Sequence, residues 1–227
     1  AYGLLTEEEL VTWHCAAGQL LESEGIERPG QLAEHFRLGR QQEKAVTYFL
    51  RAAEQAHEAA DLELTLTCVE QGLGCGAQGT MRGELLSLRI ATGLYRERFH
   101  DVLLESPEAL SLLRPGSLAW CRIFVAYFPA AAFLEGKLLP VLMQTFLQTT
   151  PSPDARATYV YGASLLSVMS GIVGQKESCK IVLARAIEVG AALHQSEHNA
   201  LAVLHGAQAN WHEQIVKLPY TNWINNQ

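Results

Sequence analysis

The sequence predicts an all-α fold, an αα superhelix of antiparallel helix hairpins, on three observations. Small and bulky apolar residues alternate at spacings of three and four along residues 31–73, so they share one face of each helix. Gly136 and Gly174, two candidate turn glycines, are 38 residues apart. Pro115 and Pro153 repeat the same spacing of 38 residues. A period near this length is typical of repeats made of two helices.

The composition indicates a folded chain that does not bind nucleic acid. With 227 residues, 48% of them hydrophobic, it can bury a core as one elongated or two compact domains. Charged residues make up 18%, too few for a coiled coil or a disordered segment. Residues 1–110 carry 18 acidic and 9 basic residues, whereas residues 111–227 carry 6 and 8. No basic stripe is available to displace counterions from phosphates.

The cysteines favour a reduced, cytoplasmic protein. There are five, widely scattered, and none forms a CxxC pair, which supports neither a disulfide framework nor a zinc ribbon. The chain has no signal peptide and does not begin with methionine, so we expect a piece of a longer polypeptide.

In chain order, a leading helix is expected within residues 1–30. Thr6 followed by Glu9 predicts a capping box at its start. Residues 31–73 then read as a short helix, a tight turn at Gly39 and Arg40, a long helix, a break at residues 60–61 and another helix.

Residues 74–79 read GCGAQG and match the pattern GxGxxG. A dinucleotide site would need a strand before this segment, and here a helix precedes it. We therefore interpret it as the end of a helix followed by a loop, and we predict no cofactor.

Residues 80–193 read as three degenerate helix pairs, and residues 196–213 as a last helix without a partner. The pairs are 81–97 with 100–113, 117–134 with 138–149, and 154–173 with 175–193. The apolar run 119–134 is short for a membrane span and contains Arg122 and Pro129, so we expect a buried helix kinked at Pro129. Residues 214–227 form a polar tail without helical period.

The sequence indicates no catalytic residue and no metal site. His194, His198, His205 and His212 lie along one helix at spacings of four and seven, and the first two could hold a metal. A third ligand is missing nearby, which favours histidines at the edge of an apolar seam.

Arg122 and Tyr161 stand out as polar residues in apolar helices. An offset of 38 residues carries Arg122 to position 160, beside Tyr161, so the two are expected to be neighbours on adjacent repeats. They form either a structural contact or part of a binding face built by the first helix of each pair. Arg89 would extend that face from the preceding pair, and such arginines can bind a peptide carboxylate through two hydrogen bonds.

The segment 31–73 resembles a tetratricopeptide-like repeat. Its matching residues take the small, aromatic, small, aromatic and small positions of that repeat: Ala33, Phe36, Ala45, Phe49 and Ala52. The turn departs from the pattern, because Gly39 lies six residues before Ala45, one more than usual.

Residues 1–86 further resemble the helical-repeat region of large bacterial signalling proteins. The resemblance is carried by AYGLLTEEE, LAEHF, KAVTYFLRAAEQA, GLGCGAQG and RGELL. In that family a serine/threonine kinase domain is often followed by an AAA/STAND-type ATPase and then by tetratricopeptide-like repeats. The resemblance implies a regulatory segment, and the family's ATP-binding and catalytic residues have no counterpart here.

The leading expectation is therefore a non-catalytic module that binds a protein or peptide and signals to upstream kinase or ATPase domains of the same chain. The alternative is a sensor with a closed apolar pocket for a small ligand, and an enzyme in its own right ranks third. We also expect no membrane partner, and self-association through uncapped superhelix ends.

Overall fold

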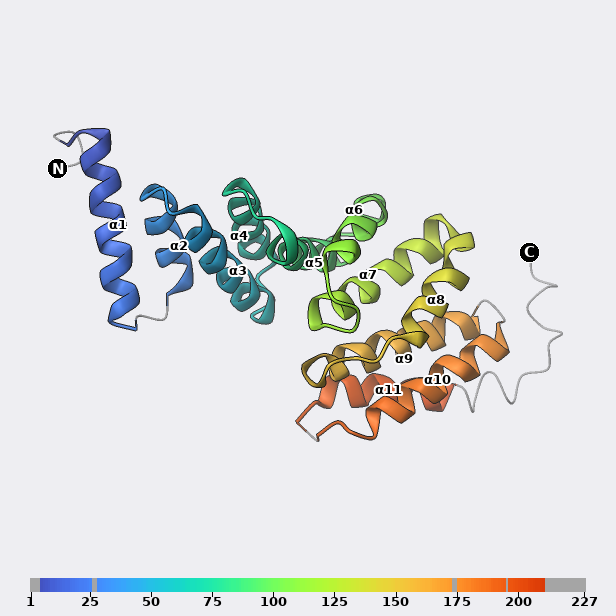
Figure 1. The fold of residues 1–227 in the computed structure, drawn as a ribbon. Helices are drawn as coiled ribbons and strands as arrows, with labels where there is room; N and C mark the ends of the chain where they lie inside the picture. The colour runs from blue at the N-terminus through green and yellow to red at the C-terminus, as the bar shows by residue number, and fades with distance from the viewer. Residues whose placement is uncertain (1–4, 26–27, 173–174, 195, 211–227) are drawn as a thin grey trace. The chain divides into compact units, whose positions relative to one another are not determined.

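The computed structural model describes residues 5–25, 28–172, 175–194 and 196–210. This described part contains eleven α-helices and no β-strand, which confirms the all-α prediction (Figure 1). The chain divides into two compact units, Ala1–Arg114 and Pro115–Gln227, called unit 1 and unit 2 below. The predicted repeat domain 1–213 thus spans two units, and the αα superhelix stays a prediction.

Unit 1 contains six helices, each packed against its neighbours in the chain, and α3 also contacts α5. Their bounds are α1 Glu7–Ser23, α2 Pro29–Leu38, α3 Gln42–Glu58, α4 Leu62–Gly74, α5 Gly79–Tyr95 and α6 Phe99–Leu112. The predicted capping box is present, since the Thr6 side chain accepts from the Glu9 amide and the Glu9 carboxylate accepts from the Thr6 amide. The glycine segment 74–79 falls between α4 and α5, as predicted.

Three turns of unit 1 share one conformation. Arg40, Ala60 and Glu97 have φ angles of +56°, +57° and +57°. In each turn, the residue that follows the left-handed one donates its amide hydrogen to the carbonyl oxygen five residues before it. These bonds run from Gln41 to Phe36 (2.8 Å), from Asp61 to Ala56 (2.9 Å) and from Arg98 to Gly93 (2.9 Å). This bond closes a helix end around a left-handed residue. Ala60 and Glu97 are 37 residues apart, close to the period predicted from the glycines of unit 2.

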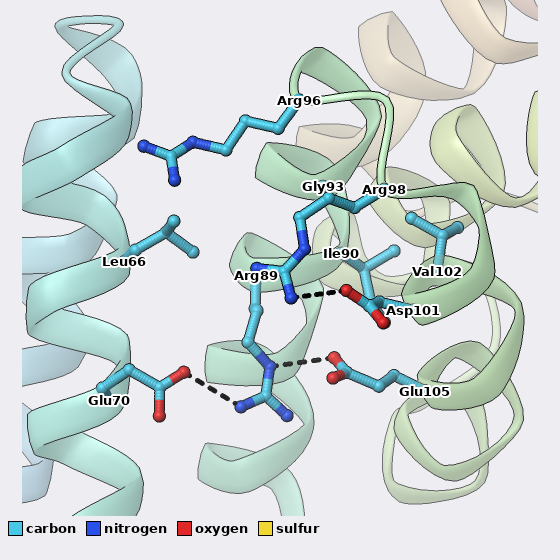
Figure 2. Close-up of a pocket in the computed structure, with 10 residues that line it drawn as sticks. All are labelled: Leu66, Glu70, Arg89, Ile90, Gly93, Arg96, Arg98, Asp101, Val102 and Glu105. Atoms are coloured by element: carbon cyan, nitrogen blue, oxygen red, sulfur yellow. Dashed lines mark hydrogen bonds and ion pairs between the residues drawn. The ribbon is translucent and has the colours of Figure 1, made fainter.

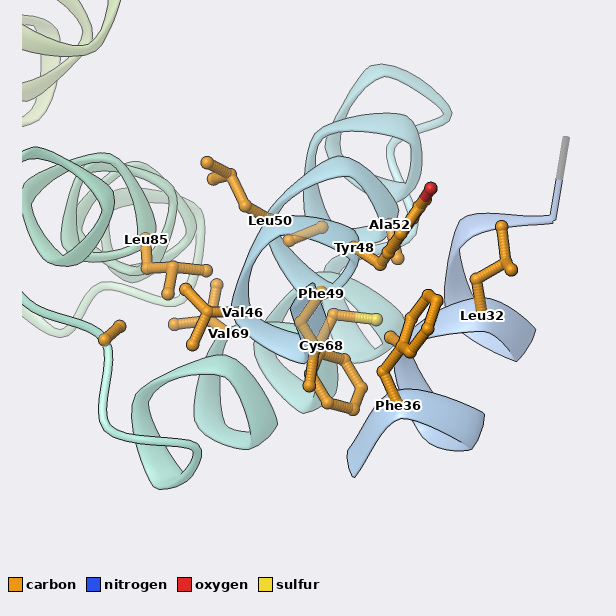
Figure 3. Packing of buried hydrophobic residues seen from close by; sticks show 14 of the residues in the cluster. Leu32, Phe36, Val46, Tyr48, Phe49, Leu50, Ala52, Cys68, Val69 and Leu85 are labelled. Carbon is orange, nitrogen blue, oxygen red and sulfur yellow. The ribbon is translucent and has the colours of Figure 1, made fainter. Parts of the chain in front are cut away.

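The core of unit 1 follows the predicted small-to-large alternation. The five matching residues are all buried: Ala33, Phe36, Ala45, Phe49 and Ala52. Phe36 stacks on Tyr48 with ring centroids 5.4 Å apart, and both lie between α2 and α3 in Figure 3. Gly18 of α1 packs on the Phe36 ring so closely that a Cβ there would lie 3.0 Å from it.

Unit 2 is organised around α9, which packs against α7, α10 and α11. Its helices are α7 Leu118–Leu134, α8 Leu139–Gln148, α9 Arg156–Ile172, α10 Lys176–Gly190 and α11 His198–Asn210. Short 3₁₀ turns, η2 Gly136–Leu138 and η3 Pro153–Ala155, precede α8 and α9, so both helices begin slightly later than predicted. Residues 211–213 of the last predicted helix, with His212, and the tail 214–227 lie outside the described residues.

An aromatic cluster fills the middle of unit 2. Phe146 of α8 contacts the rings of Trp120, Phe124 and Phe128 from α7 and stacks on Tyr159 of α9 with centroids 4.2 Å apart. The apolar side chains of residues 119–134 therefore contribute to this core. Helix α7 continues past Pro129 to Leu134. Among the described helices, none combines the length and hydrophobicity needed to cross a membrane.

Candidate functional site

Arg89 lies on α5 in a groove between α4 and α6 (Figure 2). Its Nε donates to the Glu105 carboxylate of α6 at 2.8 Å, and its Nη1 donates to Glu70 of α4 at 3.1 Å. Its side chain is 26% exposed. Burial acts to lower the pKa of Arg89, but Glu105 and Glu70 outweigh this effect and raise it. Arg89 thus bridges two helices that flank its own.

Further ion pairs link α5 and the residue after it to the two neighbouring helices. Three arginines repeat every seven residues along α5 or just after it: Arg82, Arg89 and Arg96. Arg82 pairs with Glu108 of α6 at 2.7 Å, and Arg96 pairs with Glu63 of α4. A cavity of about 120 Å³ is lined by Arg89, by the ion pair of Arg98 with Asp101, and by Leu66 and Ile90.

The ion pairs of Arg82, Arg89 and Arg96 help to hold α5 against α4 and α6. Arg89 already forms ion pairs with Glu70 and Glu105 of its own chain. A carboxylate of a bound protein or peptide would therefore have to displace one of these two glutamates. The sequence predicted Arg89 on a face formed by the first helix of each pair. Arg89 lies on α5, the first helix of its expected pair, and its ion-pair partners lie on α4 and α6, so its role in binding a partner stays a prediction.

Arg122 and Tyr161 lie in unit 2, on α7 and α9, which pack against each other. At their contact a Cβ on Gly162 would lie 3.3 Å from Val125. Arg122 and Tyr161 are both half-buried, and each has an interaction partner within the chain. The structure therefore brings their helices together, and the binding role of the two residues stays a prediction.

A larger groove lies in unit 1, where the end of α1 and the start of α2 meet the polar face of α3. It encloses about 510 Å³. One row of α3 residues lines it at spacings of three and four: Tyr48, Arg51, Gln55 and Glu58. This groove was not predicted from the sequence. The polar row opposite the alanines of α3 was the signal that could have revealed it.

Tyr48 joins the core to this groove. Its ring stacks on Phe36, while its hydroxyl points away from the core and donates to the Glu22 carboxylate at 2.8 Å (Figure 3). The Lys44 Nζ donates to the same carboxylate at 2.5 Å. The hydrogen bonds from Lys44 and then Tyr48 lower the pKa of Glu22, and burial followed by the bond to Glu22 raises the pKa of Tyr48.

Arg51 is exposed, and its guanidinium carbon lies 5.2 Å from the centroid of the Tyr48 ring. A guanidinium over an aromatic face is held by cation–π attraction and keeps its N–H groups available at its edge. The groove thus combines an aromatic platform, an arginine and an apolar floor made by Pro29 and Leu32.

Unit 2 has an apolar pocket of about 370 Å³ between the end of α7, the start of α8 and α9. Most of its lining residues are apolar: Ala132, Phe133, Leu139, Leu166 and Met169. Ser170 and Gln175 supply the polar part. The pocket is a candidate site for a small apolar ligand.

Among the described residues, no three histidine, cysteine, aspartate or glutamate side chains gather as a metal site would require. Comparison of the chain with protein-family models, with curated proteins and with solved structures finds no match.

Proposed function

We propose that this chain is a non-catalytic helical-repeat module that binds a protein or peptide. The observation that carries the proposal is the groove of about 510 Å³ in unit 1, lined by Tyr48 and Arg51. Tyrosine and arginine are enriched among the residues that contribute most to protein interfaces. A groove with polar walls along a helix also suits an extended peptide better than a compact apolar molecule.

The proposal places the module in the cytoplasm, as the regulatory segment of a bacterial serine/threonine kinase–ATPase. The support is the resemblance of residues 1–86 to the helical-repeat regions of such proteins. An αα superhelix suits this role, since stacked hairpins build a continuous surface for a partner. The sequence of the full-length polypeptide tests this part, because a chain without a kinase or ATPase domain upstream would contradict it.

The binding proposal is tested with a displayed library of short random peptides selected on the whole chain. Selected peptides are then measured by fluorescence anisotropy against Arg51→Ala and Tyr48→Phe. We expect Arg51→Ala to weaken binding by about 2 kcal/mol or more, the loss that defines an interface hot spot. Arg114→Ala is the matched control, because Arg114 is exposed and lies outside the groove. Equal affinity in the parent and Arg51→Ala would contradict the groove as the site.

The second candidate function is sensing of a small apolar ligand, favoured by the pocket beside Phe133 and Met169. Its probe is the environment-sensitive dye 1-anilinonaphthalene-8-sulfonate, titrated into the folded chain. Filling the pocket with Leu166→Trp should abolish saturable binding, whereas Ile181→Trp, at an exposed position of α10, should leave it unchanged. Equal binding by both variants would exclude this pocket as the dye site.

A further inference from the structure

Little of helix α1 is fully buried, although Leu21 packs against the core of unit 1. Within this described helix only Gly18 is buried. Polar links supply much of the rest: Glu7 pairs with Arg40 at 2.6 Å, and Glu22 pairs with Lys44 at 2.5 Å. A helix held in this way is the element of unit 1 most easily released by a change in charge.

A histidine pair lies in the middle of the contact between α1 and α2. The Nδ1 atoms of His14 and His35 are 3.0 Å apart, and the ring centroids are 5.2 Å apart. Both side chains are half-buried. Next to them the backbones approach so closely that a Cβ at Gly39 would lie 2.8 Å from the Cys15 nitrogen. The two rings therefore have little freedom to separate while α1 stays docked.

Charged and polar groups of three elements lie close to the pair. On α2, Glu34 lies near both rings but is held by Arg37 at 2.8 and 2.5 Å. On α1, the Cys15 sulfur accepts from Gln41. From the end of α4, Cys75 lies near Arg37 and Glu34, and burial raises the pKa of its thiol. The charge of Glu34 raises the pKa of His35 but does not outweigh burial and the charge of His14, which lower it.

The 3.0 Å separation fits one proton between the two Nδ1 atoms. A neutral pair has this N–H···N bond, and a singly protonated pair keeps it in a charge-assisted form. In a doubly protonated pair both Nδ1 atoms carry a proton, so two donors and two positive charges face each other. Burial and then the charge of His14 lower the pKa of His35, which agrees with this geometry.

We propose that the His14–His35 pair is a pH-dependent latch that holds α1 on α2 and releases it when both imidazoles become protonated. Release frees His35 from burial and from the charge of His14, so its pKa rises towards the ordinary value near 6.5 and the released state binds more protons than the docked state below this pH. Docking is therefore complete above pH 6.5 and weakens as the pH falls. The same release would expose Phe36, which Gly18 covers, and remove Glu22 from the wall of the groove.

The experiment is hydrogen exchange of the whole chain between pH 7.5 and 5, expressed as protection factors so that the intrinsic effect of pH is removed. We expect protection of α1 amides to fall relative to α3 amides by up to about tenfold per pH unit below 6.5, the slope for uptake of one extra proton. His35→Gln and His14→Gln should each abolish this difference. His205→Gln, in unit 2, should retain it.

The latch would be overturned if the protection factors of α1 amides changed in parallel with those of α3 amides over the whole pH range. It would also be overturned if both glutamine variants kept the pH dependence of the parent. Two variants are used because either substitution alone could disturb docking at neutral pH. The latch itself does not depend on the proposed function, and only its effect on the groove does. If α1 is released in acid but a selected peptide binds equally at both pH values, the latch stands and its proposed effect on the groove fails.

Discussion

The two units hold their helices together by different means. In unit 1, ion pairs join separate helices: Arg82 to Glu108, Arg89 to Glu70 and Glu105, and Arg96 to Glu63. In unit 2, the pairs Lys180–Glu177 and Arg185–Glu188 each join residues of α10 alone, while five aromatic rings connect α7, α8 and α9. The helices of unit 1 therefore add ion pairs to their apolar core, whereas the helices of unit 2 pack around an aromatic cluster.

The left-handed turns of the two units also differ. Unit 1 places Arg40, Ala60 and Glu97 in the left-handed region, and all three are exposed. Unit 2 places Gly116 there with φ +80°, buried against the carbonyl of Thr150. A left-handed turn in open space tolerates any residue at a modest cost, whereas a left-handed turn against a backbone requires glycine.

The largest effect is expected from Phe146→Ala, which empties the centre of the aromatic cluster. Phe146 is fully buried and contacts four other rings, so we expect a loss of about 3–5 kcal/mol in the free energy of unfolding. Urea unfolding followed by tryptophan fluorescence measures it, because Trp120 lies in the same cluster. Phe133→Ala is the control, since Phe133 is 71% exposed and should cost less than about 1 kcal/mol. Similar losses in both variants would contradict the cluster.

Gly116→Ala should be the next most damaging change. A Cβ at Gly116 would lie 2.3 Å from the Thr150 oxygen, in addition to the unfavourable φ angle. Strain and overpacking together should cost about 2–4 kcal/mol of stability in unit 2. Gly206→Ala is the opposite case, because its Cβ would meet nothing within 4 Å on α11, and it should be neutral or stabilising. The same urea titration compares the two, and equal stability for Gly116→Ala and the parent would contradict the described turn.

Arg89→Met tests the dependence of unit 1 on charge. Methionine keeps an apolar stem beside Leu66 and Ile90 but leaves Glu70 and Glu105 without their cation. Because Arg89 is partly exposed, we expect a moderate loss of about 1–2 kcal/mol. Hydrogen exchange of α4 to α6 measures it, with Arg114→Met as the control. Added salt should reduce the difference between parent and variant. A loss that does not change with salt would assign Arg89 a packing role.

The fold class was predictable because helix signals are local. The alternation of Ala33, Phe36, Ala45 and Phe49 predicted buried faces that the structure confirms. The breaks between the helices of unit 1, such as the one at residues 60–61, were also predicted and are confirmed. Their left-handed conformation was not predicted, because Ala60 and Glu97 replace the glycine that usually indicates such a helix end.

The candidate site was less predictable because it depends on contacts between distant residues. Arg89 was singled out, but only its partners, 16 and 19 residues away, reveal a bridge between helices. The Tyr48 groove requires knowledge that α1 ends beside α3, which the pairing of Glu22 with Lys44 and Tyr48 establishes. No spacing in the sequence contains this information.

The smallest effect, and the finest test of the turn comparison, is Ala60→Gly. A non-glycine residue in the left-handed region costs roughly 1 kcal/mol, while glycine gains freedom in the unfolded chain, so the net stabilisation should be about 0.5 kcal/mol. Ala60 suits this test better than Arg40, which pairs with Glu7. The adjacent Ala59 has φ −78°, so Ala59→Gly removes no strain and should destabilise by a similar amount. Thermal unfolding by circular dichroism compares the two variants, and a shift in the same direction for both would contradict the left-handed assignment of Ala60.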